Sequence, residues 1–322
     1  MSTPTINTKT FTLNNGELIP AVALGCWRAT PEDTYNSVLA AIKAGYRHID
    51  TAHAYLNEEA VGKAIKDCGV PRDELFITTK LWNTFHRDVE GALNGSLARL
   101  GLDYVDLYLV HWPVPMHPAK TPEADQIFVF KEGTNDFDVD FDWDYSKTWS
   151  AMEDLVLDGK KRVKSIGVSN LSKKRLETLL NNPNTRIIPA CNQVEMHPYC
   201  PQHELVAYCK EKGILIEGYS PLGSAGSPLI QDEVIVKLAT KLGVSPATLL
   251  ISWGLARDYV VLPKSVTVSR IESNLKTIEL DDATVDEINN LWKLRGVTRA
   301  VNRDWKIDVY NDDDPSGKVI KK

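Results

Sequence analysis

The chain has 322 residues, of which 43% are hydrophobic and 25% charged, a composition that is ordinary for a globular protein and argues against disorder. Lys and Arg number 37 against 43 Asp and Glu, the net charge is −6, and no basic block stands out, so nucleic acid is not an expected partner. No stretch approaches the roughly 18 apolar residues of a membrane span and the N-terminus has no apolar signal segment, so we expect a cytoplasmic protein that does not engage a membrane.

Short apolar or β-branched runs alternate along the chain with longer segments of helical periodicity, which is typical of repeated strand–helix units. The first segment, "TFTLNNGELIP" at 10–20, predicts a β-hairpin that turns at Asn15 and Gly16 and closes the bottom of the fold. The predicted strands then follow at 21–27, 46–51, 75–81, 104–112, 163–170, 190–196, 214–222 and 259–266. Eight parallel strands with intervening helices indicate an α/β protein, a single (β/α)8 TIM barrel over residues 1–322.

An open doubly wound sheet is the alternative fold. That fold usually places G-x-G-x-x-G after its first strand, and the motif is absent from this sequence. Two irregular stretches, 113–146 and the polar tail from about 295 onward, follow a strand end or the last helix, so we expect both to overhang the catalytic face. We expect the acidic run "NDFDVDFDWDY" at 135–145 to be solvated surface.

The cysteines are odd in number and form no C-x-x-C pair, so we expect packed, reduced thiols. They are Cys26, Cys68, Cys191, Cys200 and Cys209. The histidines show no shared metal-ligand spacing, and no metal is expected.

In barrels of this class, catalytic groups gather at the C-terminal ends of the strands, where the loops form a rigidly supported bowl. At or near those ends the sequence has Asp50, Lys80, His111, Ser169, Asn170, Lys264 and Ser265, and Gln193 lies inside the sixth strand. Any one of them alone could be a buried polar residue with its hydrogen bonds satisfied, but together they indicate an active site.

The chemistry of four of these positions is complementary. A buried lysine such as Lys80 tends to lose its proton unless an acid accompanies it, and Asp50 on the neighbouring strand supplies one. The ammonium should then favour the phenolate of Tyr55, in the loop after Asp50, and lower its pKa from the ordinary value of about 10. A tyrosine whose pKa is lowered toward neutral pH can act as a general acid or base. With His111 donating a hydrogen bond to a carbonyl oxygen, the site is suited to protonating an oxygen as charge develops on it.

Long segments around these residues resemble the signatures of the aldo-keto reductase family, and the resemblance runs from the hairpin to the last helix. The segments are "GYRHIDTAHAYLNEEAVGKAI" at 45–65, "TTKLWN" at 78–83, "DLYLVHWPV" at 106–114 and "VLPKSVTVSRIESN" at 261–274. Within the family, the chain is most similar to the fungal NADP-dependent glycerol dehydrogenase and aldehyde reductase branch.

The resemblance implies reduction of aldehydes and ketones to alcohols with NADPH, and the reverse oxidation of alcohols or polyols. It implies a catalytic tetrad of Asp50, Tyr55, Lys80 and His111, with Tyr55 as proton donor. Substrate would contact Trp27, Trp82, His111 and Trp112, and the substrate itself stays open because 113–146 and the tail shape that pocket.

The resemblance also implies a binding site for NADPH/NADP, in which Ser169, Asn170 and Gln193 hold the nicotinamide carboxamide and Tyr219 stacks on the ring. The segment 221–229 would close over the pyrophosphate. Lys264, Ser265, Thr267 and Arg270 would receive the adenosine 2′-phosphate, and two cations with two hydroxyls favour a dianion on charge grounds as well. The full implied set is Gly25, Cys26, Trp27, Ser169, Asn170, Gln193, Tyr219, Ser220, Leu222, Ser224, Lys264, Ser265, Val266, Thr267, Arg270 and Asn274.

Two other functions are compatible with the residues. Lys80 could form a Schiff base, as in barrel aldolases, although pairing with Asp50 would keep it protonated and non-nucleophilic. A cofactor-binding regulatory or structural protein of the same fold is the other alternative, and the complete tetrad argues against it.

Overall fold

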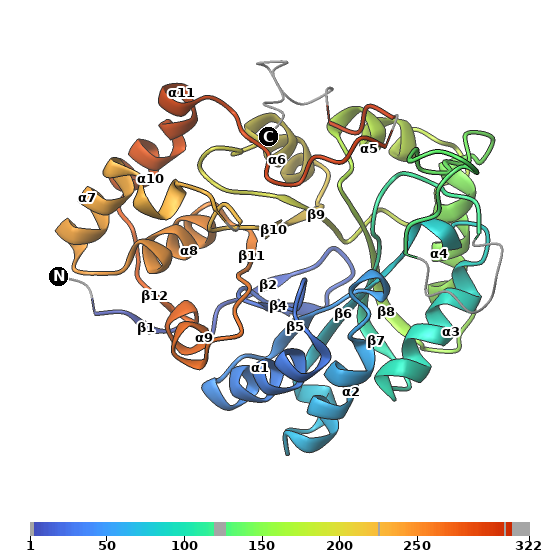
Figure 1. Ribbon diagram of the computed structural model, residues 1–322, viewed down its shortest axis with the longest axis horizontal. Coiled ribbons are helices and arrows are strands. Elements are labelled where there is room, and N and C mark those ends of the chain that lie inside the picture. The colour runs from blue at the N-terminus through green and yellow to red at the C-terminus, as the bar shows by residue number, and fades with distance from the viewer. Residues whose placement is uncertain (1–2, 119–126, 225, 306, 311–322) are drawn as a thin grey trace.

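A computed structural model describes residues 3–118, 127–224, 226–305 and 307–310 (Figure 1). Its main sheet has eight strands that pair in chain order, each parallel to its neighbour. The strands are β4 (Leu24–Gly25), β5 (His48–Asp50), β6 (Phe76–Leu81), β7 (Val105–Val110), β8 (Val163–Ser169), β9 (Cys191–Glu195), β10 (Leu215–Tyr219) and β11 (Val260–Leu262). The ring closes where Val22 forms a parallel bridge with Val261 and the Ala23 amide donates to the Val261 carbonyl at 3.0 Å. The predicted barrel is confirmed, and each observed strand lies within a predicted run.

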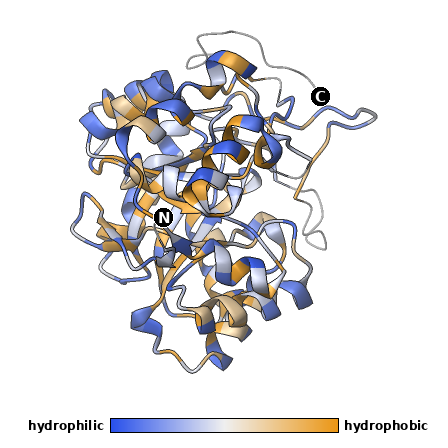
Figure 2. Cartoon of the chain, turned by 90° about the vertical axis from the view of Figure 1, so that its left-hand side faces the viewer, coloured by the Kyte–Doolittle hydropathy of each residue, from blue (hydrophilic) through white to orange (hydrophobic). Residues whose placement is uncertain are grey.

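Helices surround the strands (Figure 1), with hydrophilic residues on their outer sides (Figure 2). They are α1 (Pro31–Ala44), α2 (Glu58–Asp67), α3 (Val89–Leu100), α4 (Tyr145–Leu157), α5 (Lys173–Leu180), α6 (His203–Glu211), α7 (Glu233–Leu242), α8 (Pro246–Ala256), α9 (Val268–Asn274), α10 (Asp282–Asn289) and α11 (Leu291–Arg295). The single-turn 3-10 helices are η1 (His53–Tyr55), η2 (Arg72–Glu74), η3 (Asn83–Phe85) and η4 (Leu229–Gln231).

Local signals fix the ends of these helices. α1 begins where the Thr30 hydroxyl accepts a hydrogen bond from the Asp33 amide, and it ends just before Gly45, which caps the helix with a φ of 112° that suits glycine. Within the described part of the chain, no single helix is long and apolar enough to cross a membrane, although the bent pair α7 and α8 together meets that length and composition.

The predicted hairpin is also confirmed. β2 (Thr10–Thr12) pairs antiparallel with β3 (Leu18–Pro20), and the turn contains Gly16 with a φ of 90°. Leu13 and Ile19 from the hairpin pack in one buried cluster with residues of β6, β7, β9 and β11, so the hairpin covers the N-terminal end of the barrel. The sequence did not predict the short antiparallel pair of β1 (Thr5–Ile6) with β12 (Lys276–Thr277).

The irregular stretch after β7 and the C-terminal segment pack against each other on the rim, as expected for segments that overhang the catalytic face. Trp82 and Trp112 from the rim, Val129 and Val139 from the stretch, and Trp305 from the C-terminal segment belong to one buried cluster. Residues 119–126 and 311–322 of these stretches lie outside the described residues.

The acidic run at 135–145 is exposed at Asp136, Asp142 and Asp144, as predicted. Asp140 is an exception, because it is only 2% exposed and its Oδ2 lies 2.6 Å from Nη2 of Arg87. The prediction of solvated surface is therefore wrong at Asp140, which instead ties the irregular stretch to the segment before α3. All five cysteines are present as thiols, as expected.

Candidate active site

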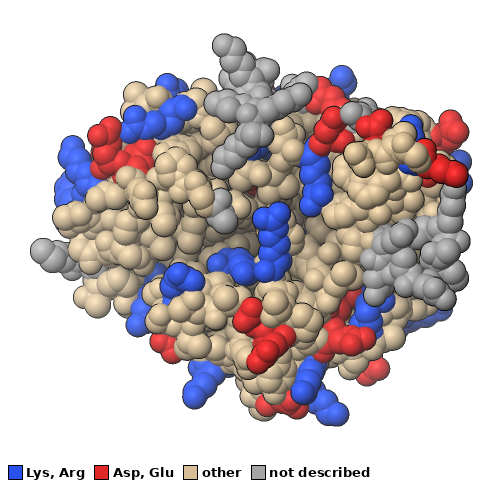
Figure 3. All heavy atoms as spheres, viewed as in Figure 1, with Lys and Arg blue, Asp and Glu red and all other residues tan. Residues whose placement is uncertain are grey.

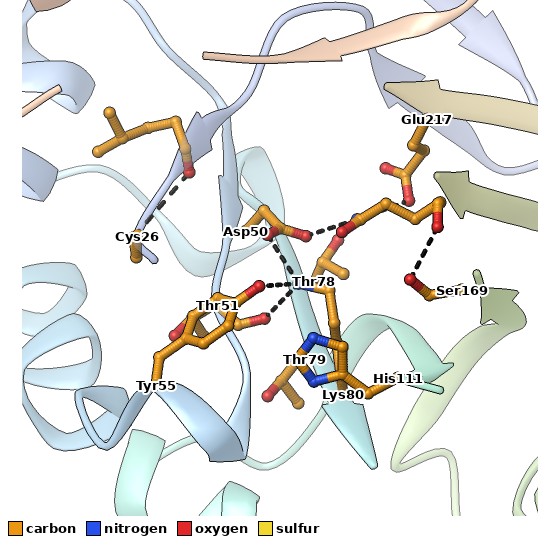
Figure 4. Close-up of polar contacts among 12 residues, drawn as sticks. Cys26, Asp50, Thr51, Tyr55, Thr78, Thr79, Lys80, His111, Ser169 and Glu217 are labelled. Atoms are coloured by element: carbon orange, nitrogen blue, oxygen red, sulfur yellow. Dashed lines mark hydrogen bonds and ion pairs between the residues drawn. The ribbon is translucent and has the colours of Figure 1, made fainter. Parts of the chain in front are cut away.

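Several of the polar residues that the sequence predicts at the strand ends lie close together, and Figure 4 shows Asp50, Lys80, His111 and Ser169 with Tyr55. Asp50 ends β5, Lys80 is next to last in β6, and Tyr55 ends the short helix η1 that follows β5. The Lys80 Nζ donates to Asp50 Oδ1 at 2.7 Å, to the Thr51 carbonyl at 2.9 Å and to Tyr55 Oη at 3.3 Å. These contacts use all three ammonium hydrogens, so Lys80 is held rigidly and in its charged form.

The Lys80 side chain is fully buried and its contacts decide its charge. Burial opposes the ammonium, but the charges of Asp50 and Tyr55 and their hydrogen bonds outweigh burial, so the pKa of Lys80 lies above its ordinary value. This agrees with the sequence-based expectation that Asp50 keeps the lysine protonated.

The expected direction of the Tyr55 pKa is wrong. Burial raises the pKa of Tyr55 to about 12, and the Lys80 charge acts in the opposite direction without overcoming it. The sequence indicated the neighbouring ammonium but not how completely the phenol is enclosed. The phenol therefore keeps its proton at neutral pH, a state suited to a proton donor.

His111 follows β7 directly, and its ring faces that of Tyr55 edge-on with 5.6 Å between the centroids. Burial, together with the charges of Lys80 and Arg303, holds the pKa of His111 well below its usual range, so the imidazole is neutral at neutral pH. A neutral imidazole carries one N–H donor, and Tyr55 and His111 together can offer hydrogen bonds to one oxygen atom.

The four predicted nicotinamide residues form a connected network beside His111, in which Asn170 Nδ2 donates to Ser169 Oγ at 3.1 Å. Asn170 Nδ2 donates to the His111 carbonyl at 3.0 Å, and Tyr219 Oη donates to Asn170 Oδ1 at 2.9 Å. The Ser169 hydroxyl donates to the Gln193 carbonyl at 2.7 Å. The φ of Asn170 is 61°, in the left-handed region that asparagine tolerates better than most residues, and this conformation turns the chain at the end of β8.

The Gln193 side chain lies deeper, inside the barrel. Its Nε2 donates to Asp50 Oδ2 at 2.8 Å and to Glu217 Oε2 at 3.2 Å. The structure therefore brings Gln193 to the tetrad as well as to the neighbourhood of Ser169. Cys26 is likewise enclosed, and burial raises the pKa of its thiol to about 12.

The residues predicted for the 2′-phosphate also come together. Arg270 Nη2 donates to Thr267 Oγ1 at 2.6 Å, and Arg270 Nε donates to Ser265 Oγ at 3.4 Å. Lys264 and Arg270 are exposed, and neither is in an ion pair within the described residues. Two cations without a carboxylate partner, beside two hydroxyls, fit an anionic phosphate.

The other predicted cofactor residues lie at or after the ends of β4, β10 and β11. A Cβ at Gly25 would lie 3.5 Å from the Leu262 carbonyl oxygen and 3.8 Å from the Lys264 Cβ, so β4 and the end of β11 approach closely there. Ser220, Leu222 and Ser224 lie in the loop after β10, residue 225 of which is outside the described residues. Val266 is exposed before α9, and Asn274 is buried at its end. The face in Figure 3 is hollowed near its middle, with Lys and Arg side chains along the hollow.

The predicted substrate-contacting tryptophans separate into two places. Trp82 and Trp112 are nearly buried, with ring centroids 6.4 Å and 5.4 Å from that of Trp305. The Trp82 ring also lies 5.2 Å from His111, so this aromatic group borders the tetrad. Trp27 is half-buried after β4, and Arg28 lies over its ring at 4.3 Å.

The sequence interpretation did not single out Glu195, the last residue of β9. The Glu195 carboxylate is 1% exposed and accepts hydrogen bonds from the amides of Ala300 at 2.6 Å and Val301 at 2.9 Å, and from His197 Nε2 at 2.8 Å. Glu195 therefore attaches the C-terminal segment that brings Trp305 to the rim. The available signal was its position two residues after Gln193, which places both side chains on one face of the strand.

Among the described residues, no group of three or more His, Cys, Asp or Glu side chains is arranged to hold a metal ion.

Comparison with known proteins gives one consistent family. The model of the "Aldo/keto reductase family" matches residues 11–293.

Two relatives from Saccharomyces cerevisiae are similar over nearly their whole length. The aldehyde reductase YPR1 is 51% identical over 298 residues, covering 92% of this chain and 95% of the relative. A glycerol 2-dehydrogenase (NADP(+)) is 48% identical over 301 residues, covering 93% and 96%. The solved structure of the aldose reductase from Schistosoma japonicum superimposes with a TM-score of 0.81 at 34% identity, covering 88% of this chain and 92% of that one.

Proposed function

This chain belongs to the aldo/keto reductase family, and we propose that it reduces aldehydes and ketones to alcohols with NADPH and oxidises alcohols and polyols in the reverse direction. The observation that carries the proposal is the Lys80 ammonium, which is bonded to both Asp50 and Tyr55 beside a neutral His111. The names of the two yeast relatives, an aldehyde reductase and an NADP(+)-dependent glycerol dehydrogenase, are consistent with both directions.

In the proposed reaction, the carbonyl oxygen lies between the Tyr55 hydroxyl and the His111 ring. When bound, NADPH supplies a hydride to the carbonyl carbon. Tyr55 donates its proton to the oxygen as negative charge develops there, and the Lys80 ammonium stabilises the phenolate that remains. Asp50 keeps Lys80 charged through this proton transfer, and His111 orients the carbonyl group by donating a hydrogen bond.

We propose that the nicotinamide end of the cofactor is held by Ser169, Asn170, Gln193 and Tyr219, and the 2′-phosphate by Lys264, Ser265, Thr267 and Arg270. The connected hydrogen bonds beside His111 support this assignment, as do the exposed Lys264 and Arg270, which form no ion pair with any residue that the structure describes. Between these two ends, we assign the cofactor to Gly25, Cys26, Trp27, Ser220, Leu222, Ser224, Val266 and Asn274. The carbonyl or polyol substrate would contact Trp27, Trp82, His111 and Trp112.

The alternatives are not favoured. All three hydrogens of the Lys80 ammonium are donated to Asp50, Thr51 and Tyr55, so the nitrogen has no lone pair for Schiff-base formation. The presence of the whole tetrad argues against a purely regulatory or structural member of the fold.

A kinetic experiment tests the proposal. Purified protein is mixed with NADPH and a panel of aromatic aldehydes, aliphatic aldehydes and keto-esters, and the loss of NADPH absorbance is followed. We expect carbonyl-dependent oxidation of NADPH with at least one class. The absence of any carbonyl-dependent rate across the panel would contradict the function.

We also propose that residues 1–322 form one domain and that the protein is cytoplasmic. The reduced cysteines are consistent with a reducing compartment. A single unfolding transition that is the same by fluorescence and circular dichroism, and recovery of the protein in the cytosolic fraction, are the expected results.

A further inference from the structure

A second carboxyl group lies inside the barrel near the tetrad, on a residue that the proposed mechanism does not use. Glu217 is in the middle of β10, two residues before Tyr219, and its side chain is fully buried. Its register partners are Gln193 on β9 and Val260 on β11. Glu217, labelled in Figure 4 near Asp50, accepts hydrogen bonds on Oε2 from Gln193 Nε2 at 3.2 Å and from the Cys191 thiol at 3.4 Å.

Glu217 is connected to the tetrad through the Gln193 amide. The same Nε2 that donates to Glu217 donates to Asp50 Oδ2 at 2.8 Å, while Asp50 Oδ1 accepts from Lys80 at 2.7 Å. We propose that Glu217 is a positioning residue for the tetrad, which orients the Asp50 carboxylate through Gln193 and makes the charge around Lys80 depend on pH. This inference depends on the proposed carbonyl reduction by the tetrad.

The orienting role follows from the chemistry of a primary amide. The Gln193 amide nitrogen has two hydrogens, and the two carboxyl groups of Asp50 and Glu217 take one each. Turning the amide over would place its carbonyl oxygen against two acceptors, which is unfavourable in a buried site. Glu217 therefore holds Gln193 in the one orientation that leaves Asp50 with a donor on each carboxylate oxygen.

The electrostatic role follows from the groups that face Glu217. These are Asp50 and His48 from β5, Lys80 from β6 and Cys191 from β9. His48 Nε2 lies 4.0 Å from Glu217 Oε1, but burial lowers the pKa of His48 to about 4, so it is neutral at neutral pH. Of these groups, Lys80 is then the cation that two acids share.

This arrangement makes Glu217 titrate near neutral pH. Burial and the Asp50 charge raise the pKa of Glu217 to about 7, and Oε1 has no hydrogen-bond partner among the described residues. As the pH rises through this value, Glu217 becomes negative and opposes formation of the Tyr55 phenolate. Because alcohol oxidation needs the phenolate as base, a neutral residue at position 217 should move the oxidation profile toward lower pH.

The test compares Glu217→Gln and Glu217→Leu with the parent, using alcohol oxidation with saturating NADP across about pH 5 to 10. Glu217→Gln keeps an acceptor oxygen for Gln193 but removes the charge. We expect its kcat near pH 5, where Glu217 is protonated in the parent, to stay within about threefold of the parent, and its rising limb above about pH 7 to shift by about one pH unit to lower pH. Glu217→Leu removes the acceptor, and we expect kcat to fall about tenfold or more in both directions.

Glu153→Gln is the matched control. Glu153 is another fully buried glutamate, in α4, whose carboxylate accepts hydrogen bonds from the Arg186 and Ile187 amides away from the tetrad. Its replacement should change the melting temperature but leave the pH profile of kcat unmoved.

A second measurement does not use activity. The raised pKa of Glu217 means that its ionisation costs stability as the pH rises from the unfolded value toward about 7. Glu217→Gln should therefore gain melting temperature relative to the parent between about pH 5 and pH 8. The infrared carbonyl band of a protonated carboxyl group, present in the parent below pH 7, should be lost in this variant.

A pH profile of Glu217→Gln that superimposes on that of an active parent overturns the inference, whatever the Leu variant does. An inactive parent would instead contradict the proposed function, so the two failures are distinguishable.

Discussion

The basic group at the end of β11 makes a quantitative prediction about cofactor choice. Arg270 is held by hydrogen bonds to Thr267 and Ser265, so its guanidinium is already oriented before a phosphate arrives. A charge-assisted hydrogen bond contributes about 1.5 to 3 kcal/mol. Because Arg270 is exposed and screened by solvent, we take the lower half of that range.

Arg270→Ala should therefore weaken NADPH binding by about 10- to 50-fold and change NADH binding by less than about twofold. With Lys264, which is also exposed, contributing to the same extent, the parent should prefer NADPH over NADH by about 10² to 10³ in affinity. Raising the salt concentration should weaken NADPH more than NADH, since the pocket faces solvent.

The assay is a fluorescence titration of each protein with each cofactor, because Tyr219 and the rim tryptophans should report binding. Lys241→Ala is the matched control, since Lys241 is an exposed cation on α7 that is not in the basic group. Parent dissociation constants for NADPH and NADH that agree within threefold would refute the reasoning. An Arg270→Ala variant that weakens both cofactors equally would also refute it.

Three further predictions concern the tail, the hairpin and pH. Glu195→Ala removes the acceptor for two amides of the C-terminal segment, so substrate KM should rise about tenfold with a smaller change in kcat, and limited proteolysis should cut that segment faster. An unchanged KM and an unchanged rate of proteolysis would show that the C-terminal segment is held by other contacts. Ile19→Ala opens a cavity in the buried cluster between the hairpin and the barrel, and it should lower the unfolding free energy by about 2 to 4 kcal/mol in urea titrations. A loss of less than about 1 kcal/mol would contradict that packing. The rate of alcohol oxidation should keep rising through alkaline pH because the base is the phenolate of Tyr55, whose pKa burial raises to about 12, and a plateau near pH 7 would disagree.

The barrel was predictable because its information is local. Each barrel strand is a short apolar run bounded by turn residues, and every strand of the eight-stranded barrel lies inside one of the predicted runs. The tetrad was predictable for a related reason, since Asp50, Lys80 and His111 interrupt apolar runs at the same end of consecutive strands.

What the sequence did not reveal depends on contacts between distant segments. The attachment of the C-terminal segment to Glu195 joins residues about a hundred positions apart, and no local pattern marks it. Glu217 occupies a strand interior, where alternation cannot say which charges will face it. The direction of the Tyr55 pKa depended on how completely the phenol is enclosed, which only the packed structure gives.

The central claim is that Tyr55 protonates the substrate oxygen, and Tyr55→Phe tests it most directly. Tyr35→Phe is the matched control, since Tyr35 donates to Asp67 at 2.9 Å on the surface and is not in the tetrad. In single-turnover aldehyde reduction with NADPH, we predict that Tyr55→Phe slows the reaction by about 10² to 10⁴ while the NADPH dissociation constant stays within about threefold. Tyr35→Phe should match the parent in both. A Tyr55→Phe rate within tenfold of the parent would contradict the account and assign the proton to another group.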